Sequence, residues 1–248
     1  MGSNPDGPTT LRVWGLPQIK GISAVSFDGD GTLWDFDAVM RHSLENVLRE
    51  MERFDPQRAS RITIDRMIEV RRLVARESKG RTTNLEEVRL EAFRQTLRDV
   101  GEPDEALALH LNDIYLRHRF EDIELFPDVL PTLTALQSDY VLGLLSNGNS
   151  YPQRCGLGDA LQFVVLSQDH GVEKPDTALF KVAAEEAGCS PEEMVHVGDS
   201  LGTDVLGANN AGMVSIWLNR RGVQNGTGIL PRYEVQSLTG ILGILQER

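Results

Sequence analysis

The sequence predicts an α/β fold: a parallel β-sheet with helices on both faces, with a helical bundle inserted after the first strand. Two observations carry this prediction. In most of the chain, short apolar segments that end in turn residues alternate with helical segments, as in a parallel sheet covered by helices. Between the first and second apolar segments, however, amphipathic helical segments follow one another without a strand.

The predicted strands are short, mostly apolar runs that stop at Gly, Asn, Asp or Ser. They cover residues 22–28, 140–146, 163–167, 194–197 and 214–218. Helical segments at 176–188 and 202–212 separate the later strands, and each ends in glycine. Because strands and helices alternate in this half of the chain, we expect its strands to be parallel.

Capping residues and apolar spacing predict the inserted helices. We expect them to start at Asp37, Thr63, a Thr83–Glu86 capping box and Pro103, and to run to residues 53, 78, 100 and 119. A further helix near 127–137 leads back to the sheet. The predicted parts are a flexible leader over 1–20, a sheet domain over 21–36 and 123–248, and a helical bundle over 37–122.

Composition and charge exclude several classes of protein. With 40% hydrophobic and 25% charged residues, the chain is close to the average for globular proteins. A net charge of −12 repels a phosphate backbone and argues against a nucleic-acid partner. No apolar stretch approaches the ~20 residues of a membrane span, so we expect a cytoplasmic protein without a membrane partner. Cys155 and Cys189 form no CxxC motif, and we expect neither a disulfide framework nor a thiolate metal site.

Polar side chains fall at the carboxyl ends of the predicted strands, where open α/β sheets bind ligands. Asp28, Ser146, Lys174 and Asp199 lie at or just beyond such ends. The separation of Asp28 from Ser146 far exceeds the roughly 30 residues of one βα unit. We therefore expect the helical insertion to lie over the strand ends as a lid on the site.

The residue types at these strand ends indicate phosphoryl transfer. Asp28, Asp30 and Asp199 would crowd carboxylates into one crevice, which raises their pKa values or requires a counter-cation. Mg²⁺ prefers such oxygen ligands, keeps several waters and also binds substrate phosphate. Lys174 supplies a second positive charge, and Ser146 with the following Asn-Gly turn offers donors for phosphate oxygens.

Four motifs, in order, resemble those of the haloacid dehalogenase superfamily over about residues 22–245. The segment Phe27-Asp28-Gly29-Asp30-Gly31-Thr32-Leu33 resembles the first motif, Ser146-Asn147 the second, Lys174-Pro175 the third, and Gly198-Asp199-Ser200 with Asp204 the fourth. The insertion after the first motif resembles the C1 cap of subfamily I, seen in phosphatases of phosphoglycolate, pyrimidine nucleotides, sialic acid 9-phosphate and flavin mononucleotide. The resemblance implies a Rossmann-like sheet domain, a C1 cap over residues 37–122 and a Mg²⁺-dependent phosphatase.

The resemblance also implies which residues carry the chemistry. Asp28 would attack phosphorus and form an aspartyl phosphate. Asp30 would act as general acid and then as general base. The Mg²⁺ ligands would be the Asp28 carboxylate, the Asp30 backbone carbonyl and Asp199.

The remaining motif residues would bind phosphate or support the site. By the same resemblance, Ser146, Asn147 and Lys174 would hold the transferring phosphate oxygens. Asp204 would bind the metal through water or orient Lys174. Thr32 would brace the loop by hydrogen bonds.

Other functions share parts of this pattern. A haloacid dehalogenase would use the same aspartate to displace halide without metal, but halide needs no proton from Asp30. A phosphomutase shares every motif. A phospho-accepting receiver domain has no comparable insertion, and a catalytically inactive interaction module gains no support from four retained motifs. We expect a small soluble phosphomonoester as substrate, of the sugar phosphate, phosphoglycolate, nucleotide or flavin mononucleotide type, whereas the oligomeric state is open.

Several residues near the motifs have a structural interpretation as well as a functional one. Trp34 could stack on a substrate ring or pack under the insertion. Ser200 is expected to cap a helix, and His196 to be a hydrogen-bonded core residue. The cluster Arg71, Arg72, Arg76 and Arg81 could bind a second anionic group, but we interpret it as a solvated helix face.

Overall fold

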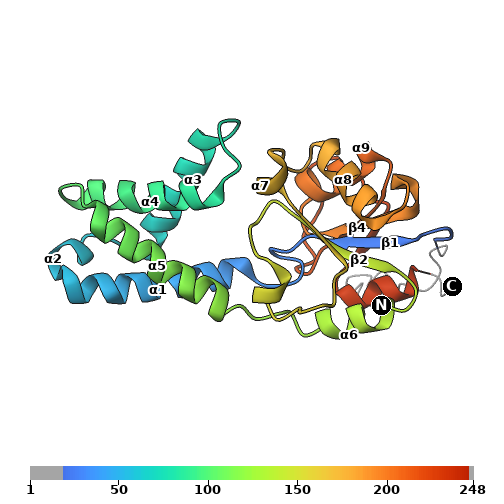
Figure 1. The fold of residues 1–248 in the computed structure, drawn as a ribbon, viewed down its shortest axis with the longest axis horizontal. Helices are drawn as coiled ribbons and strands as arrows, with labels where there is room; N and C mark the ends of the chain where they lie inside the picture. Colours follow the sequence, from blue (N-terminus) through green and yellow to red (C-terminus); the bar gives the residue numbers. More distant parts are fainter. Residues whose placement is uncertain (1–18, 246–248) are drawn as a thin grey trace, which may run out of the picture.

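A computed structural model describes residues 19–245 and shows two parts side by side, a β-sheet with its helices and a group of helices formed by residues 36–121 (Figure 1). The expected leader lies outside the described residues as far as residue 18. Ile19, the first described residue, pairs with Leu245 in an isolated parallel bridge. None of the helices between residues 19 and 245 has the length and apolar character that a bilayer crossing requires.

The sheet has six parallel strands in the order β3-β2-β1-β4-β5-β6. They are β1 (Ala24–Phe27), β2 (Val141–Ser146), β3 (Phe163–Leu166), β4 (Met194–Gly198), β5 (Val214–Leu218) and β6 (Tyr233–Val235). The parallel α/β fold and the strands predicted from the sequence are confirmed. The edge strand β6 was missed because three residues are too few to show a periodic pattern.

Helices cover both faces of the sheet, as predicted (Figure 1). They are α6 (Val129–Leu136), α7 (Ser167–His170), α8 (Thr177–Ala187) and α9 (Leu206–Ala211), with the π-helical turn η3 (Leu201–Val205) and the 3-10 helices η1 (Pro152–Arg154), η2 (Pro191–Glu193) and η4 (Leu238–Gly243). Side chains of β1 alternate between the faces. Val25 and Phe27 pack with Leu133 of α6, whereas Ala24 packs with Phe180 of α8.

The helical part has a hydrophobic core of its own. Its helices are α1 (Phe36–Phe54), α2 (Pro56–Ala59), α3 (Ile64–Ser78), α4 (Leu85–Val100) and α5 (Glu105–Glu121). Val47, Met51, Leu97 and Leu111 are fully buried among them. Because this core does not draw on the sheet, the helical part is stabilised largely by its own packing.

The helix starts show how closely capping residues can be read from sequence. Thr63 caps α3 as predicted, and its hydroxyl accepts from the backbone N–H of Arg66. The other long helices of this part start one or two residues away from the prediction, since a nearby Asp or Asn side chain supplies the accepting oxygen. The observed caps are Asp35 and Asn84 rather than Asp37 and Thr83, and Asp104 caps α5, so that Pro103, expected in the first turn, lies just before the helix.

The chain leaves the sheet part and returns to it at one place. Trp34, just before α1, pairs with Leu125, just after α5, in an isolated antiparallel bridge. The backbone N–H of Phe126 donates to the carbonyl of Leu33 at 3.0 Å. The two connecting segments therefore lie side by side.

A salt bridge between Arg220 and Asp128 connects this junction to the C-terminal part of the sheet. The Arg220 guanidinium donates to both Asp128 carboxylate oxygens, at 2.9 and 3.0 Å, and to the Thr32 carbonyl at 2.8 Å. Asp128 also accepts from Ser237 Oγ and from the backbone N–H of Leu238. A bidentate pair with these added donors is both strong and directional.

This junction makes stability depend on the charge of Asp128. Burial alone would raise its pKa, but the Arg220 guanidinium and the donors from Ser237 and Leu238 hold the pKa of Asp128 below its usual range. A lowered carboxylate pKa stabilises the fold above the unfolded value near 4 and ceases to do so as the pH falls through the folded value. We expect Asp128→Asn to lower the free energy of unfolding by about 1–3 kcal/mol at pH 7.

Urea unfolding at pH 7 and at pH 3 checks this prediction. The difference between Asp128→Asn and the wild type should be smaller at pH 3, where the carboxylate begins to protonate. The exposed Asp159 serves as a control, because Asp159→Asn removes one negative charge at a position that faces solvent. An equal loss of stability at both pH values would contradict the role assigned to the Asp128 charge.

Candidate active site

The predicted site residues meet at the carboxyl edge of the parallel sheet. Asp28 directly follows β1, Ser146 ends β2 and Asp199 directly follows β4. Lys174, in the loop before α8, reaches the same edge and bonds to Asp28. Neighbouring parallel strands end on one side of a sheet, so residues far apart in the sequence become neighbours here.

Lys174 is the central cation of this site, with 3% of its surface exposed. Its Nζ donates to Asp28 Oδ1 at 2.7 Å, to Asp204 Oδ1 at 2.6 Å and to the Leu145 carbonyl at 2.8 Å. These bonds use all three ammonium protons. Burial alone would lower the pKa of Lys174, but the Asp204 and Asp28 carboxylates outweigh burial and raise it.

Asp204 is held by donors on both carboxylate oxygens. Besides Lys174, it accepts from His196 Nε2 at 3.3 Å and from the backbone N–H of Ser200 at 2.9 Å. Although burial opposes this, Lys174 and His196 hold the pKa of Asp204 well below its usual range. Because these donors occupy the carboxylate, it is poorly placed to bind a metal and well placed to orient Lys174.

His196 and Ser200 have the structural roles expected from the sequence. His196 is buried in β4, and its Nδ1 lies 2.8 Å from Ser26 Oγ. Burial lowers the pKa of His196, which favours a neutral ring that donates from Nε2 to Asp204. Ser200 caps η3, accepting from the backbone N–H of Thr203.

Carboxylates crowd the crevice next to Lys174. One oxygen each from Asp28, Asp199 and Asp204 lies within 4.8 Å of the others. Loss of hydration, with a contribution from the Asp204 charge and against the opposing charge of Lys174, raises the pKa of Asp28 to about 7 and that of Asp199 to about 6. Lys174 offsets only part of this negative charge, and the hard oxygen donors fit a divalent cation such as Mg²⁺.

Gly31 makes room for this cluster. Its φ of +85° lies in the left-handed region, which favours glycine. A Cβ at this position would also lie 2.4 Å from Asp199 Oδ2. The glycine between Asp30 and Thr32 therefore lets the first loop approach the Asp199 carboxylate.

Asp30 is half-buried beside the cluster, with one oxygen already engaged. Trp34 Nε1 donates to Asp30 Oδ1 at 2.6 Å, and Arg119 Nη2 lies 3.5 Å from the same atom. The other oxygen, Oδ2, faces Gly148. Trp34 itself is only 1% exposed and packs in the hydrophobic core of the sheet part, so it offers no free ring face for stacking.

The side chains of Asn147 and Thr32 do not have the contacts that the sequence led us to expect. The Asn147 side chain donates to the Lys174 carbonyl at 3.0 Å and accepts from its N–H at 2.7 Å. It therefore positions the Lys174 loop. The Thr32 hydroxyl is buried without a partner among the described residues, whereas its backbone N–H donates to the Gly29 carbonyl at 3.1 Å.

Three arginines from the helical part were not singled out together by the sequence. Arg71 of α3, Arg89 of α4 and Arg119 of α5 line a pocket that also contains Asp30 and Asn149. In the predicted solvated cluster, Arg72, Arg76 and Arg81 are indeed exposed, but Arg71 is half-buried and belongs to this pocket. A signal was present for Arg89, because it shares a helix face with the buried Ala92 and Phe93.

Comparison with known proteins agrees with this arrangement. The sequence profile of the haloacid dehalogenase-like hydrolases matches residues 22–212. Glyceraldehyde 3-phosphate phosphatase of Methanopyrus kandleri is 29% identical over 237 residues, covering 91% of this chain and 98% of the relative. The 5-amino-6-(5-phospho-D-ribitylamino)uracil phosphatase of Escherichia coli is 29% identical over 234 residues, covering 90% and 96%.

A solved structure extends the similarity to the whole fold. The 2-haloacid dehalogenase of Pseudomonas syringae superposes with a TM-score of 0.76 at 30% identity, covering 90% of this chain and 97% of that one. The sheet order and the carboxylates at its edge define an α/β protein of the Rossmann-like class. Within that class, the chain belongs to the haloacid dehalogenase-like hydrolases.

The central cation generates a stability prediction. Lys174→Met would leave Asp28 and Asp204 buried without their common partner, and breaking a buried pair in this way costs about 3–5 kcal/mol. We expect a loss of that size in urea unfolding at pH 7. Adding Asp204→Asn to Lys174→Met should restore part of it, because one of the unpaired carboxylates is then neutral. A loss below about 1 kcal/mol, typical of an exposed pair, would contradict the proposed burial of this charge.

Proposed function

We propose that this chain is a Mg²⁺-dependent phosphatase that hydrolyses a small soluble phosphomonoester through an aspartyl-phosphate intermediate. The observation that carries the proposal is the buried Asp28 carboxylate, held by Lys174 at 2.7 Å beside the Asp199 carboxylate. A nucleophile fixed in this way next to a cation suits attack on an anionic phosphate. The phosphatase relatives in an archaeon and in Escherichia coli support the same chemistry.

In the first step, an Asp28 oxygen bonds to phosphorus while the bond from phosphorus to the leaving alkoxide breaks. The carboxylic acid form of Asp30 gives its proton to that alkoxide. Trp34 and Arg119 hold Asp30 Oδ1, so Oδ2 is the oxygen that carries the proton. The products are the alcohol and an aspartyl phosphate.

In the second step, the Asp30 carboxylate takes a proton from water, and the water oxygen bonds to phosphorus. The bond from phosphorus to the Asp28 oxygen breaks, which restores the carboxylate and releases inorganic phosphate. The same oxygen of Asp30 serves both steps, because the leaving alcohol and the attacking water occupy the same position in turn. The enzyme therefore returns to its starting protonation state.

The other residues divide into metal ligands and phosphate ligands. The Asp28 and Asp199 carboxylates and the Asp30 backbone carbonyl would hold Mg²⁺, which would offset the charge that accumulates during phosphoryl transfer. The Ser146 hydroxyl, the Asn147 backbone N–H and Lys174 would hold the transferring oxygens. Asp204 positions Lys174 rather than binding the metal.

The helical part would act as a C1 cap over this centre. Helix α5 brings Arg119 to 3.5 Å from Asp30, and Arg119 also donates to Ser150 after β2. The helices therefore reach the strand ends where substrate would bind. A cap in contact with the general acid can both exclude water and select the leaving group.

A haloacid dehalogenase is the second candidate, because the solved structure of that name covers almost the whole chain. Both reactions use an aspartate nucleophile. Halide leaves without a proton, however, whereas the alkoxide of a phosphomonoester needs one, and Asp30 with its fixed Oδ1 supplies it. A phosphomutase would share the first step and differ by protecting the phosphoenzyme from water.

Phosphate release from a panel of sugar phosphates, nucleotides, phosphoglycolate and flavin mononucleotide tests the proposal. We expect turnover with Mg²⁺ and none in EDTA. Asp28→Asn should reduce turnover by roughly three orders of magnitude or more, because the amide cannot form the acyl phosphate. Asp159→Asn, which changes an exposed aspartate in the same way, should leave turnover unchanged.

Two outcomes would contradict the phosphatase. Halide release from 2-chloropropionate in EDTA, without phosphatase activity, would assign the dehalogenase reaction. A phosphoenzyme that passes its phosphoryl group to a sugar faster than to water would assign a phosphomutase.

A further inference from the structure

The pocket between the helical part and Asp30 contains an excess of positive charge. Arg71, Arg89 and Arg119 all line it, and Asp30 is the one carboxylate among its described lining residues. The exposed Glu86 adds only a distant interaction with Arg89. The chain has a net charge of −12. The three guanidinium groups next to the reacting centre therefore make this pocket positive in a protein that is negative as a whole.

Arg89 is the least compensated of these groups. It is 7% exposed, and it makes no hydrogen bond or ion pair with any described residue. Its guanidinium lies 5.6 Å from the Tyr115 ring centre. Burial is the main cause that lowers the pKa of Arg89 to about 10, and the charges of Arg119 and Arg71 act in the same direction.

Arg119 is only partly compensated, because its Nη2 donates to Ser150 and lies 3.5 Å from Asp30. It is 3% exposed, and its Nη1 is buried without a partner among the described residues. Arg71 lies 5.3 Å from the Phe36 ring centre and has no carboxylate partner among the described residues. Buried charges are costly unless they are paired, so this arrangement is incomplete in the free protein.

We propose that Arg71, Arg89 and Arg119 bind a second anionic group of the substrate, an oxyanion in the part of the molecule that leaves as the alcohol. This inference rests on the proposed phosphatase and adds the class of its substrate. A carboxylate or phosphate oxyanion accepts hydrogen bonds from guanidinium groups in a fixed geometry, which supplies the missing partners. Arg119 lines this pocket and lies 3.5 Å from Asp30, so the second anion would bind beside the general acid.

A matched series of substrates tests the proposal. Phosphate esters with a three-carbon chain can end in a hydroxyl, a carboxylate or a second phosphate, and a five-carbon series repeats the comparison at a longer reach. We expect kcat/KM to be at least tenfold higher for one of the anionic ends than for the hydroxyl. The carboxylate and the bisphosphate arms show which oxyanion the pocket takes. Without the pocket, the negative protein would repel the more charged substrates, so the preference is diagnostic.

Arg89→Gln should raise KM for the preferred anionic substrate at least tenfold and change kcat/KM for p-nitrophenyl phosphate less than twofold. The adjacent Arg72 is exposed and provides the matched control, because Arg72→Gln removes the same charge from outside the pocket. Arg89→Gln should also be at least as stable as the wild type in urea, since it removes an unpaired buried charge. A purely structural Arg89 would instead lower stability and both activities together.

The outcomes separate this inference from the function on which it rests. If no phosphate ester is hydrolysed, p-nitrophenyl phosphate included, the phosphatase itself is wrong. If all esters are hydrolysed with equal kcat/KM, or if Arg89→Gln leaves the preference unchanged, only the second anion site is wrong.

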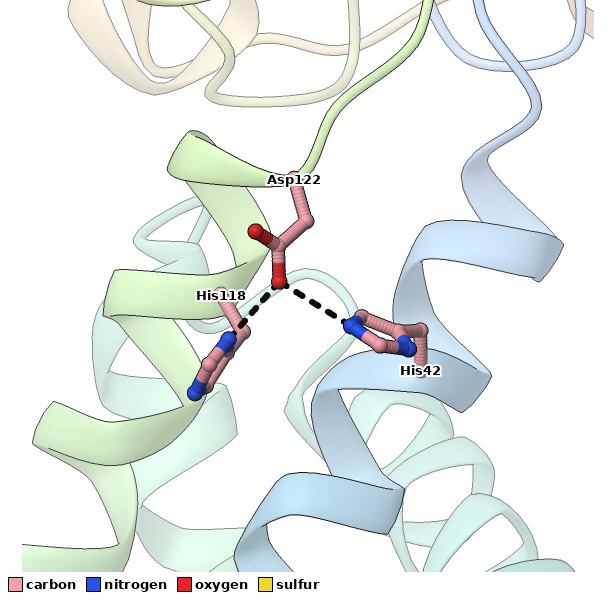
Figure 2. A group of neighbouring side chains, drawn as sticks. All are labelled: His42, His118 and Asp122. Atoms are coloured by element: carbon pink, nitrogen blue, oxygen red, sulfur yellow. Dashed lines mark hydrogen bonds and ion pairs between the residues drawn. The ribbon is translucent and has the colours of Figure 1, made fainter.

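A separate observation, in the helical part, carries a second inference. His42 of α1 and His118 of α5 both point to Asp122 at the end of α5 (Figure 2). Asp122 Oδ2 lies 2.7 Å from His118 Nδ1 and 3.1 Å from His42 Nε2. One ligand atom from each of the three residues lies within 4.8 Å of the others.

We infer that His42, His118 and Asp122 form a site for a transition-metal ion such as Zn²⁺. Two imidazole nitrogens with one carboxylate oxygen are ligands that Zn²⁺ accepts and Mg²⁺ does not prefer. His118 lies in the last turn of α5 and Asp122, four residues later, is its C-cap, so the end of one helix supplies two of the ligands. The bound ion would replace the contact between His42 Nε2 and the Asn46 side chain, at 3.2 Å, and join α1 to α5.

Isothermal titration of Zn²⁺ into the full chain tests this site, with excess Mg²⁺ present to occupy the carboxylates near Lys174. We expect one equivalent of Zn²⁺ to bind, with the affinity reduced at least tenfold in His42→Ala and in His118→Ala. His170 is exposed outside the site, so His170→Ala should bind Zn²⁺ like the wild type. Absence of binding by the wild type, or equal affinity in all variants, would overturn the inference.

Discussion

The ammonium group of Lys174 is the interaction on which the site depends. It lies between Asp28, which follows β1, and Asp204 of η3, and it also donates to a carbonyl of β2, so one atom joins three separate segments of the chain. Without it, the buried carboxylates could not remain together and ionised. The neighbouring side chains serve this cation in turn, since Asn147 holds its backbone and His196 holds Asp204.

The sequence predicted those parts of the fold and site that depend on short-range patterns. Strand ends, the four motifs and the helical insertion all follow from the order of residue types along the chain. The edge strand β6 was missed because it pairs over only three residues and is defined by its neighbour β5. The helix starts at Asp35, Asn84 and Asp104 were displaced, since several polar residues in a row can cap a helix and packing selects one.

The roles of individual side chains were harder to predict, because they depend on what lies opposite. Trp34 could have been a substrate contact, but its ring is buried and its Nε1 binds Asp30. Arg71 looked like part of an exposed cluster until α4 and α5 placed Arg89 and Arg119 beside it. These three arginines come from three different helices, and no regular spacing in the sequence predicts that they meet.

The junction at Trp34 and Leu125, where the chain leaves the sheet and returns to it, has a consequence for how the chain folds. The central strands β1 and β2 pair Ala24 with Val141, more than a hundred residues apart, which is a slow contact for a chain to find. The helices between them can collapse on their own core first, and the chain then leaves and returns at one point. If the insertion folds first, fewer flexible residues separate the two strands, and the entropic cost of bringing them together falls. We therefore expect an insertion that is already folded to speed the pairing of β1 with β2.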